Sequence, residues 1–423
     1  MVKKELHYRG FSKTPVFGKA ALDLNEKTVY NHHYNSCIMR EKFMVYKEFG
    51  KTGIKLSALG FGAMRLPMKE IDGKKIVDEN LAVPLMQKAF DMGINYVDTA
   101  PLYCETLSEN AVGKALKGYR DKVYLSTKNP IEDNSGDHWM ERLEKSLKKL
   151  DTDYIDFYHF WGISLKSFNG WQKESYGPIQ AAYKAKEQGL IKHISFSHHD
   201  APENYKPIVD SGIFESTLVQ YNMLDRSNEE NIAYAKSKGL GTIIMGPVGG
   251  GRLGAPSGQI QNLLKEKTNN NPVSTAEMAL RFVLANENVD MALSGMSDLK
   301  MLNENFEIAS RTGHLTAEEL AHINKMMEEN KNLAKLYCTG CNYCKPCPQG
   351  IDIAYIFEIM NRYKVYDLKE HAKAAYLEMM KGLSWIKSAD ASKCILCGEC
   401  EKKCPQKLPI IKQLAETHAA LAP

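Results

Sequence analysis

The chain has 423 residues, which is enough for two domains rather than one small core. Its hydrophobic content of 43% and charged content of 25% are typical of a soluble globular protein. With 55 Lys and Arg against 51 Asp and Glu, the formal net charge of +4 is too small to indicate nucleic-acid binding. The sequence has no run of about 18 apolar residues, and no apolar segment follows its charged N-terminus. We therefore expect a cytoplasmic protein that does not bind membranes.

Residues 1–43 show no clear hydrophobic period, and a sharper pattern begins at Met44. The first 43 residues are either a flexible extension or precede a physiological start at Met44, and both interpretations stay open. Soon after Met44, the KTG of residues 51–53 predicts a hairpin turn.

From there the chain alternates short apolar runs with stretches of helical period. The strand-like runs are 57–64, 94–100, 122–128, 153–161, 191–197, 216–222, 241–247 and 289–296. The helical stretches are 79–92, 108–118, 137–150, 177–189, 202–211, 228–239, 275–287 and 299–310. Strands joined by helical crossovers form a parallel sheet, and eight of them fit a closed (β/α)8 TIM barrel, which we place at 44–315. The alternative is an open doubly wound sheet, but GFGAM after the first strand lacks its glycine fingerprint.

Three polar side chains come at or just after the ends of successive strands: Asp98, Tyr103 and Lys128. Active sites of β/α barrels lie at the C-terminal ends of the strands, so we expect these side chains to meet at the barrel mouth. A lysine beside a phenol favours the phenolate and lowers its pKa, and an aspartate holds that lysine charged and in place. The tyrosine can then protonate a carbonyl oxygen as a hydride arrives at the carbon.

The stretches VDTAPLY, LSTK and DYIDFYHFW around these residues resemble the corresponding stretches of the aldo/keto reductase family, over about 44–312. The resemblance implies hydride transfer from NADH or NADPH to an aldehyde or ketone. It assigns Tyr103 as the acid/base, Lys128 as the group that adjusts the pKa of the tyrosine, and Asp98 as the partner of the lysine.

The fourth catalytic position departs from the pattern of that family. The family usually carries a histidine where this sequence has Trp161, and His159 stands two residues earlier. Side chains two apart on a strand share a face, so His159 faces the interior one layer deeper. There it is either in reach of the substrate oxygen or a buried core residue, and Trp161 either lines the pocket or fills the barrel. His198 and His199, after the fifth strand, are further candidate polar contacts.

The resemblance also implies cofactor contacts at the barrel mouth. Ser197, Gln220 and Asn222 stand where the family binds or supports the nicotinamide carboxamide. Glycine-rich loops after the seventh and eighth strands, followed by a helix N-terminus, predict a phosphate site. The further contacts are Gly62, Met64, Met245, Pro247, Gly249, Leu253, Gly295, Ser297 and Asn305. Lys300 is the one cation near the last helix, so NADH and NADPH both stay open, as does a bound flavin.

After the barrel, residues 316–336 predict a linking helix, and 337–423 predict a small, mostly helical domain. Eight of the ten cysteines lie there, in YCTGCNYCKPCPQG and CILCGECEKKCPQ. The second run has the bacterial ferredoxin spacing C-x2-C-x2-C-x3-C-P, and the first run is one residue shorter. We therefore expect a ferredoxin-type domain with two [4Fe–4S] clusters, held by Cys338, Cys341, Cys344, Cys347, Cys394, Cys397, Cys400 and Cys404.

The arrangement in ferredoxins gives one cluster three cysteines of 338–344 with Cys404, and the other cluster three cysteines of 394–400 with Cys347. The short first run leaves this assignment open. Two structural zinc sites are the alternative, but zinc sites usually come as separated cysteine pairs, and four cysteines in one tight run suit a cubane better. Cys37 and Cys104 lie outside both runs, and we interpret them as packing residues.

Two functions fit the sequence. One is a carbonyl reductase for a small molecule, with clusters that are structural or form a docking module. The other is an oxidoreductase whose clusters exchange single electrons with a partner protein. Because a nicotinamide gives two electrons together and a cubane takes one, the second function needs a device such as a flavin. A catalytically silent barrel is a third interpretation, against which the Asp98–Tyr103–Lys128 set argues. We expect Phe160, Trp161, Trp171 and the loop at 162–176 to shape the pocket, without identifying the substrate.

Overall fold

The structure is a computed structural model, and it describes residues 43–249, 253, 273–311, 313–335, 338, 344–404 and 408–423. Cys37 and Cys341 lie outside the described residues, as do 250–252 and most of the loop that follows them.

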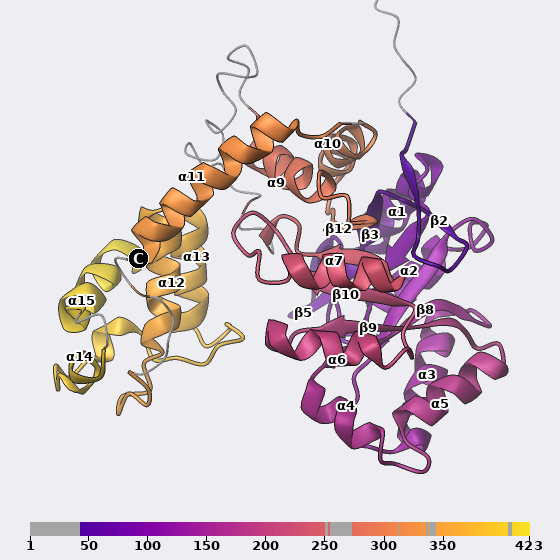
Figure 1. The fold of residues 1–423 in the computed structure, drawn as a ribbon, viewed down its shortest axis with the longest axis horizontal. Helices are drawn as coiled ribbons and strands as arrows, with labels where there is room; N and C mark the ends of the chain where they lie inside the picture. Colours follow the sequence, from indigo (N-terminus) through magenta and orange to yellow (C-terminus); the bar gives the residue numbers. More distant parts are fainter. Residues whose placement is uncertain are drawn as a thin grey trace, which may run out of the picture. The chain divides into compact units, whose positions relative to one another are not determined.

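Eight parallel strands close into a barrel, in the order β10-β11-β12-β3-β6-β7-β8-β9 (Figure 1). The strands are β3 (Leu59–Gly62), β6 (Tyr96–Asp98), β7 (Tyr124–Asn129), β8 (Ile155–Ile163), β9 (Ile191–His198), β10 (Ser216–Gln220), β11 (Gly241–Met245) and β12 (Met291–Gly295). Each one lies within or overlaps a predicted apolar run. The predicted closed barrel is confirmed, and the open-sheet alternative is wrong.

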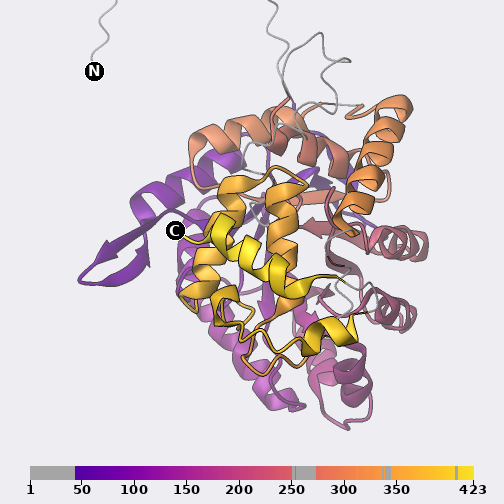
Figure 2. The same ribbon diagram turned by 90° about the vertical axis from the view of Figure 1, so that its left-hand side faces the viewer.

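Helices follow the strands and surround the barrel (Figure 2). They are α1 (Glu79–Asp91), α2 (Ser108–Ala115), α3 (Gly136–Leu150), α5 (Pro178–Glu187), α6 (Tyr205–Asp210), α7 (Glu229–Lys238), α9 (Thr275–Leu284) and α10 (Leu299–Ala309). Each matches a predicted helical stretch, except that 202–211 is divided between the short 3-10 helix η2 (Pro202–Asn204) and α6.

In the barrel, one hairpin and one helix were not predicted from the sequence. The antiparallel pair of β4 (Met68–Ile71) and β5 (Lys74–Val77) follows the one-turn 3-10 helix η1 (Ala63–Arg65) and projects from the barrel (Figure 2). Its turn is Asp72-Gly73 with both φ angles positive, which is the strongest short-range hairpin signal in a sequence. The other element, α4 (Leu165–Trp171), lies in the segment interpreted as a loop, and Ser164 caps it by accepting the N–H of Ser167.

A second hairpin closes the N-terminal end of the barrel. Strands β1 (Tyr46–Glu48) and β2 (Lys55–Ser57) pair antiparallel on either side of residues 51–53, which confirms the predicted turn. Phe49 beside this turn is fully buried and meets the ring of Phe157 edge to face at 5.2 Å. Gly241, the first residue of β11, lies against this ring, and a Cβ on it would come within 2.4 Å of Phe49. Strand β11 must therefore start with glycine. The side chain of Phe49 therefore occupies the barrel interior at its N-terminal end. The C-terminal end is left for a site.

Acidic side chains secure the starts of three strands. Each accepts a hydrogen bond from a backbone N–H of the neighbouring strand: Asp156 from Leu125 (2.9 Å), Glu215 from Ile194 (3.1 Å) and Asp290 from Thr242 (3.0 Å). Each also pairs with a base, namely Arg120, His193 with Lys186, and Lys236. These carboxylates lie at the N-terminal end, so their role is to fix strand register.

The cysteine-containing domain has its own apolar core, built on α12 (Ile353–Lys364), α13 (Lys369–Met380) and α15 (Ile410–Leu421). The linking helix α11 (Ala317–Lys335) precedes it, and η5 (Ala391–Lys393) and α14 (Glu399–Lys403) flank the second cysteine run. The predicted helical stretch 353–382 is two helices, because Asp367 between them has a left-handed φ of 52°. A small, mostly helical domain is confirmed. Among the described residues, no helix has the length and apolarity needed to cross a membrane.

We predict that Glu215→Gln destabilises the barrel in a pH-dependent way. Burial alone would raise the pKa of Glu215, but hydrogen bonds from His193, Lys186 and the Ile194 N–H outweigh it and lower the pKa from 4.5 to about 2. A depressed pKa in the folded state stabilises above the unfolded value, and this stability is lost as pH falls from about 4.5 towards 2.

For this variant, urea unfolding at pH 7 should show a loss of roughly 1–3 kcal/mol, shrinking as the pH approaches 2. Glu187→Gln, an exposed glutamate near the end of α5, is the control and should change stability by no more than about 0.5 kcal/mol. A loss that stays constant with pH would contradict the ion-pair explanation.

Candidate active site

A buried ion pair lies at the C-terminal end of the barrel. Asp98 ends β6 and Lys128 lies near the end of the adjacent β7, and each residue is 2% exposed. The Lys128 ammonium donates to an Asp98 oxygen at 2.5 Å and to the Thr99 carbonyl at 2.8 Å. Ser126 donates to the other Asp98 oxygen at 2.8 Å. Both charges are therefore paired and hydrogen-bonded, which is the condition for burying them.

The pKa of Lys128 is raised by its neighbours. Burial works to lower it, but the Asp98 carboxylate and the Tyr103 hydroxyl outweigh burial and keep the lysine protonated. The end of the barrel thus holds a fixed positive charge.

Tyr103 lies beside this charge. The Lys128 nitrogen is 4.9 Å from the centre of the Tyr103 ring, so the predicted meeting of Asp98, Tyr103 and Lys128 occurs. The expected direction of the pKa shift was wrong. Burial raises the pKa of Tyr103, and the opposing effect of Lys128 is smaller. The phenol is therefore neutral at pH 7 and holds a proton that it can donate.

The turn that carries Tyr103 is strained. Cys104, Glu105 and Thr106 all have left-handed φ angles, 51°, 54° and 68°, without a glycine among them. This conformation costs roughly 1–2 kcal/mol per residue. Ser108, just after the turn, is held by two contacts. Its hydroxyl donates to the Ala63 carbonyl at 2.7 Å and lies 2.7 Å from the Thr99 hydroxyl. Strain held by surrounding contacts is common at functional sites, and no residue type in this turn predicted it.

His159 and Trp161 lie at different depths on β8. His159 is fully buried, and its Nε2 is 3.5 Å from the Tyr96 hydroxyl. Burial and the Lys128 charge lower the pKa of His159 to about 3, so its ring is neutral. Trp161 is half-buried and meets Tyr103 edge to face at 5.9 Å. Of these two residues, Trp161 is the one that contacts Tyr103.

The end of β8 is irregular. Its pairing with β9 shifts between Phe160 and Ile163, and the Gly162 N–H donates to the Ser197 hydroxyl at 2.8 Å. His199 is exposed and lies near Gly162, and partial burial of its ring together with the Lys128 charge lowers its pKa. Bulges next to active sites often redirect a side chain in this way.

The other candidates near this point face away from the mouth. His198 is buried against Tyr205, with ring centres 5.1 Å apart, and burial lowers its pKa to about 4. Phe160 and Trp171 are also buried and pack on each other at 5.7 Å, within the core that includes α3 and α5. The expectation that Phe160 and Trp171 shape the pocket is therefore wrong, because both belong to the packing around the barrel.

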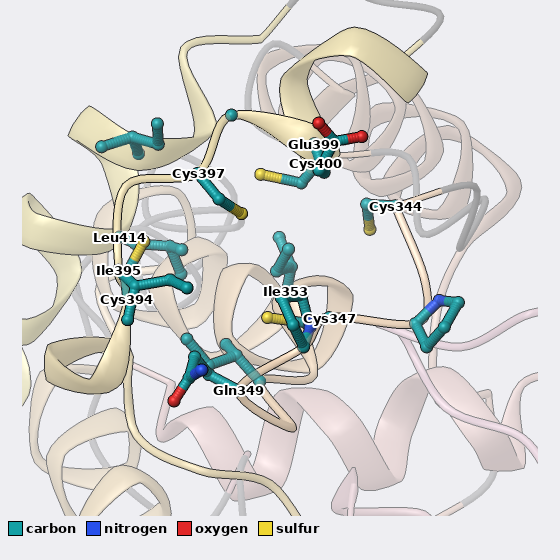
Figure 3. Close-up of a pocket in the computed structure, with 15 residues that line it drawn as sticks. Cys344, Cys347, Gln349, Ile353, Cys394, Ile395, Cys397, Glu399, Cys400 and Leu414 are labelled. Atoms are coloured by element: carbon teal, nitrogen blue, oxygen red, sulfur yellow. The ribbon is translucent and has the colours of Figure 1, made fainter.

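Five cysteines line one hollow in the C-terminal domain: Cys344, Cys347, Cys394, Cys397 and Cys400. Figure 3 shows the labelled sulfurs of Cys347, Cys397 and Cys400 directed into it, with Cys394 at its edge. Ile353 and Leu414 form part of its apolar wall, and Gln349 and Glu399 are the polar residues, besides the cysteines, that line it. Cys404 does not line this hollow and is buried in the core of the domain.

Comparison with known proteins agrees with this geometry. The model of the aldo/keto reductase family matches residues 58–328, and that of a 4Fe-4S dicluster domain matches residues 337–408. The chain belongs to the aldo/keto reductase family.

Individual relatives match the barrel of this aldo/keto reductase. An L-galactose dehydrogenase of Arabidopsis thaliana is 30% identical over 68% of this chain and 95% of its own length. An uncharacterized oxidoreductase of Bacillus subtilis is 27% identical over 67% of this chain and 97% of its own. The holo structure of an aldo-keto reductase from Bacillus halodurans is 30% identical, with a TM-score of 0.56 over 67% of this chain and 96% of its own. The chain is therefore an oxidoreductase by family.

The predicted cofactor positions on β9 and β10 lie close to the loop after β11. Gln220 contacts Gly246, where an added Cβ would come within 2.6 Å of the Gln220 Oε1 and where φ is 62°. Asn222 donates to the Gly246 carbonyl at 3.1 Å and accepts the N–H groups of Leu224 and Asp225. Asn222 therefore shapes its own turn, whereas the amide of Gln220 faces the backbone of the glycine loop. Ser197, fully buried, is already engaged by the Gly162 N–H.

The remaining cofactor positions lie on β3, β11, β12 and the segments after them. Gly62 and Gly295 pair across β3 and β12, and a Cβ on Gly62 would come within 3.3 Å of the Ser294 carbonyl. Asn305 of α10 donates to the Ser294 hydroxyl at 3.1 Å. Asp298, missed from the sequence, caps α10 by accepting the Met301 N–H at 2.8 Å. The others divide by exposure, with Met64 and Ser297 exposed, Met245 half-buried, and Pro247, Gly249 and Leu253 buried.

We predict strong coupling between Lys128 and Asp98. Lys128→Met leaves the Asp98 carboxylate buried without a cation and should lower the free energy of unfolding by about 3–5 kcal/mol. Asp98→Asn combined with Lys128→Met removes both charges and should recover part of that loss. Urea unfolding of the single and double variants measures the coupling. Strictly additive losses would show that the two groups act independently.

Proposed function

We propose that the barrel reduces the carbonyl group of a small molecule with a hydride from NADH or NADPH. The observation that carries this proposal is the neutral, half-buried Tyr103 beside the paired Lys128–Asp98 charges. The carbonyl oxygen gains negative charge as the hydride arrives at its carbon. A phenol at that oxygen transfers its proton, which is general acid catalysis.

Each of the three residues has its own role in the proposal. Tyr103 is the acid, and the strained turn at 104–106 holds its ring in place. Lys128 stabilises the phenolate that remains, because its charge lies 4.9 Å from the ring. Asp98 keeps the lysine protonated and positioned. In the reverse direction the same phenolate accepts the proton of an alcohol, which is the direction named for the relative from Arabidopsis thaliana.

The second polar contact to the carbonyl oxygen is assigned to His199. Trp161 occupies the position where the family usually has histidine, and His159 lies beneath it, neutral and 3.5 Å from Tyr96. We therefore propose that His159 is a buried polar residue beneath the site and does not donate a proton to the substrate. Trp161 provides a flat apolar wall beside Tyr103, which favours a substrate with an apolar face.

The nicotinamide cofactor supplies the hydride when it is bound. Ser197 and Gln220 are the proposed carboxamide contacts, and Gly62 and Gly295, paired across β3 and β12, are proposed contacts of the remaining part of the cofactor. The Asp298 carboxylate at the start of α10 repels a phosphate at that helix end. Lys300 is 83% exposed and lies 3.9 Å from Glu304, so it favours neither NADPH nor NADH.

For the C-terminal domain we propose two [4Fe–4S] clusters. Cys394, Cys397 and Cys400 with Cys347 would hold the first, as in the ferredoxin arrangement, and these four line the same hollow, which Cys344 also borders. Cys338, Cys341 and Cys344 with Cys404 would hold the second, which agrees with Cys404 lying away from that hollow. The proposed limits of the parts are 44–315 for the barrel, 316–336 for the linker and 337–423 for the cluster domain.

An electron-transfer oxidoreductase is the second candidate, in which a flavin couples the clusters to the barrel. One observation favours it: Cys397, a proposed cluster ligand, is exposed, so a cluster edge would be open to a partner. An anaerobic visible spectrum before and after adding NADH or NADPH separates the two functions. Bleaching by nicotinamide supports electron transfer, whereas carbonyl reduction without bleaching supports the reductase.

We predict that Tyr103→Phe lowers kcat/KM for a carbonyl test substrate by about 10²–10⁴-fold, because the acid is lost. Binding of NADPH, followed by its fluorescence, should be unchanged, since the phenol does not hold the cofactor. Tyr183→Phe, an exposed tyrosine on α5, is the matched control and should retain full activity. If Tyr103→Phe turned over the substrate as fast as the unmodified chain, Tyr103 would not be the general acid.

We also predict the iron content of the anaerobically reconstituted protein. Two clusters require about eight iron atoms per chain, and Cys394→Ser should reduce this to about four by disabling the first cluster. Cys104→Ser, outside both runs, should leave the iron content unchanged. Retention of all iron in Cys394→Ser, or a zinc content of two per chain, would contradict the cluster proposal.

A further inference from the structure

The segment 380–397, which joins the end of α13 to the second cysteine run, exposes much apolar surface. Trp385 is 93% exposed, Leu383 73% and Leu396 67%. Met380, Ile386 and Ile395 are also among the exposed large hydrophobic side chains. Isolated exposed apolar residues are common, but six within one short segment indicate an interaction surface. A tryptophan at its most exposed point is the residue type that most often anchors such interfaces.

This segment is attached to the wall of the cysteine hollow. The Ser388 hydroxyl accepts the Asp352 N–H at 2.8 Å, and the Ala389 N–H donates to the Gly350 carbonyl at 3.0 Å. Gly350 and Asp352, which make these bonds, alternate in the sequence with residues that line the hollow, namely Gln349, Ile351 and Ile353. The segment then ends in Cys394-Ile395-Leu396-Cys397, where two exposed apolar residues directly precede the exposed Cys397. The apolar surface therefore leads to the edge of the proposed cluster.

The charge of the segment is positive. Lys381, Lys387 and Lys393 are all exposed, and the acidic residue of the segment, Asp390, is half-buried and accepts from the Ser392 N–H at 2.9 Å. Three lysines minus one aspartate give +2. A partner that fits this surface carries negative charge around an apolar centre.

We propose that the segment 380–397 is the docking surface for a small acidic iron–sulfur carrier protein. The proposal rests on the clusters of the proposed function. In the step it serves, the reduced carrier loses one electron and the cluster held by Cys397 gains it. No bond forms or breaks, and no proton is transferred.

The test uses the full-length protein with its clusters and an acidic plant-type ferredoxin as the probe. Binding is measured by calorimetry at low salt, and cluster reduction by stopped-flow absorbance with either reduced ferredoxin or dithionite. Trp385→Ser, and the combination of Lys381→Glu, Lys387→Glu and Lys393→Glu, should each weaken ferredoxin binding at least 10-fold. Both should slow cluster reduction by ferredoxin to the same degree and leave reduction by dithionite unchanged. Leu81→Ser, at a 60% exposed site on α1, is the control and should have no effect.

Salt should weaken the binding to the unmodified protein, and less so in the lysine variant. Undetectable ferredoxin binding, or equal binding by all variants, would overturn the proposal. So would binding of the segment to anionic phosphatidylserine vesicles, or a dimer that Trp385→Ser dissociates, because another occupant would then cover the surface. If carbonyl reduction fails while ferredoxin binding behaves as expected, the proposed barrel function fails and the docking surface stands.

Discussion

The site depends on one buried positive charge. Lys128 is almost completely removed from water, and such a burial is costly unless the charge is paired and its other donors are satisfied. The neighbouring strands β6 and β7 meet this condition, because one supplies Asp98 and the Thr99 carbonyl while the other supplies the lysine itself and Ser126. Other properties of the site follow from this charge. It adds to the effect of burial in lowering the pKa of His159 and of His199, and it opposes the effect of burial on the pKa of Tyr103.

Order at the N-terminal end of the barrel makes irregularity at the other end tolerable. There, Phe49 fills the interior, and three carboxylates fix the register of neighbouring strands. At the C-terminal end the backbone departs from regular geometry in the turn at 104–106, in the shifted pairing after Phe160 and at Gly246. Such departures persist only where surrounding structure determines them, and here they place Tyr103, His199 and Gln220.

The sequence predicted what depends on periodicity and on strand ends. Alternation of apolar runs and helices was enough for the barrel, and Asp98 and Lys128 meet because parallel strands end at one edge. What depends on depth and neighbours was not predictable. The two-residue period of a strand predicted which face His159 lies on but not how deeply it is buried. The charge of Lys128 alone predicted a lowered pKa for Tyr103, whereas burial raises it. The turn at 104–106 contains no glycine, so nothing marked its conformation, whereas the Asp72-Gly73 signal was present and was overlooked.

In the proposed function, the two halves of the chain would handle electrons in different numbers. A nicotinamide delivers a hydride, and the neutral phenol of Tyr103 is suited to the proton that must accompany it. The cysteine domain needs no proton donor, and the described residues around its hollow are mainly apolar side chains and thiols. A cluster there would take one electron per encounter with a carrier, whereas a hydride carries two electrons together. Unless a flavin stores the first electron, the clusters cannot drive carbonyl reduction directly. In the proposed reductase, nicotinamide alone would supply the electrons of the barrel reaction, and the surface at 380–397 would serve a second electron path that the barrel residues do not require.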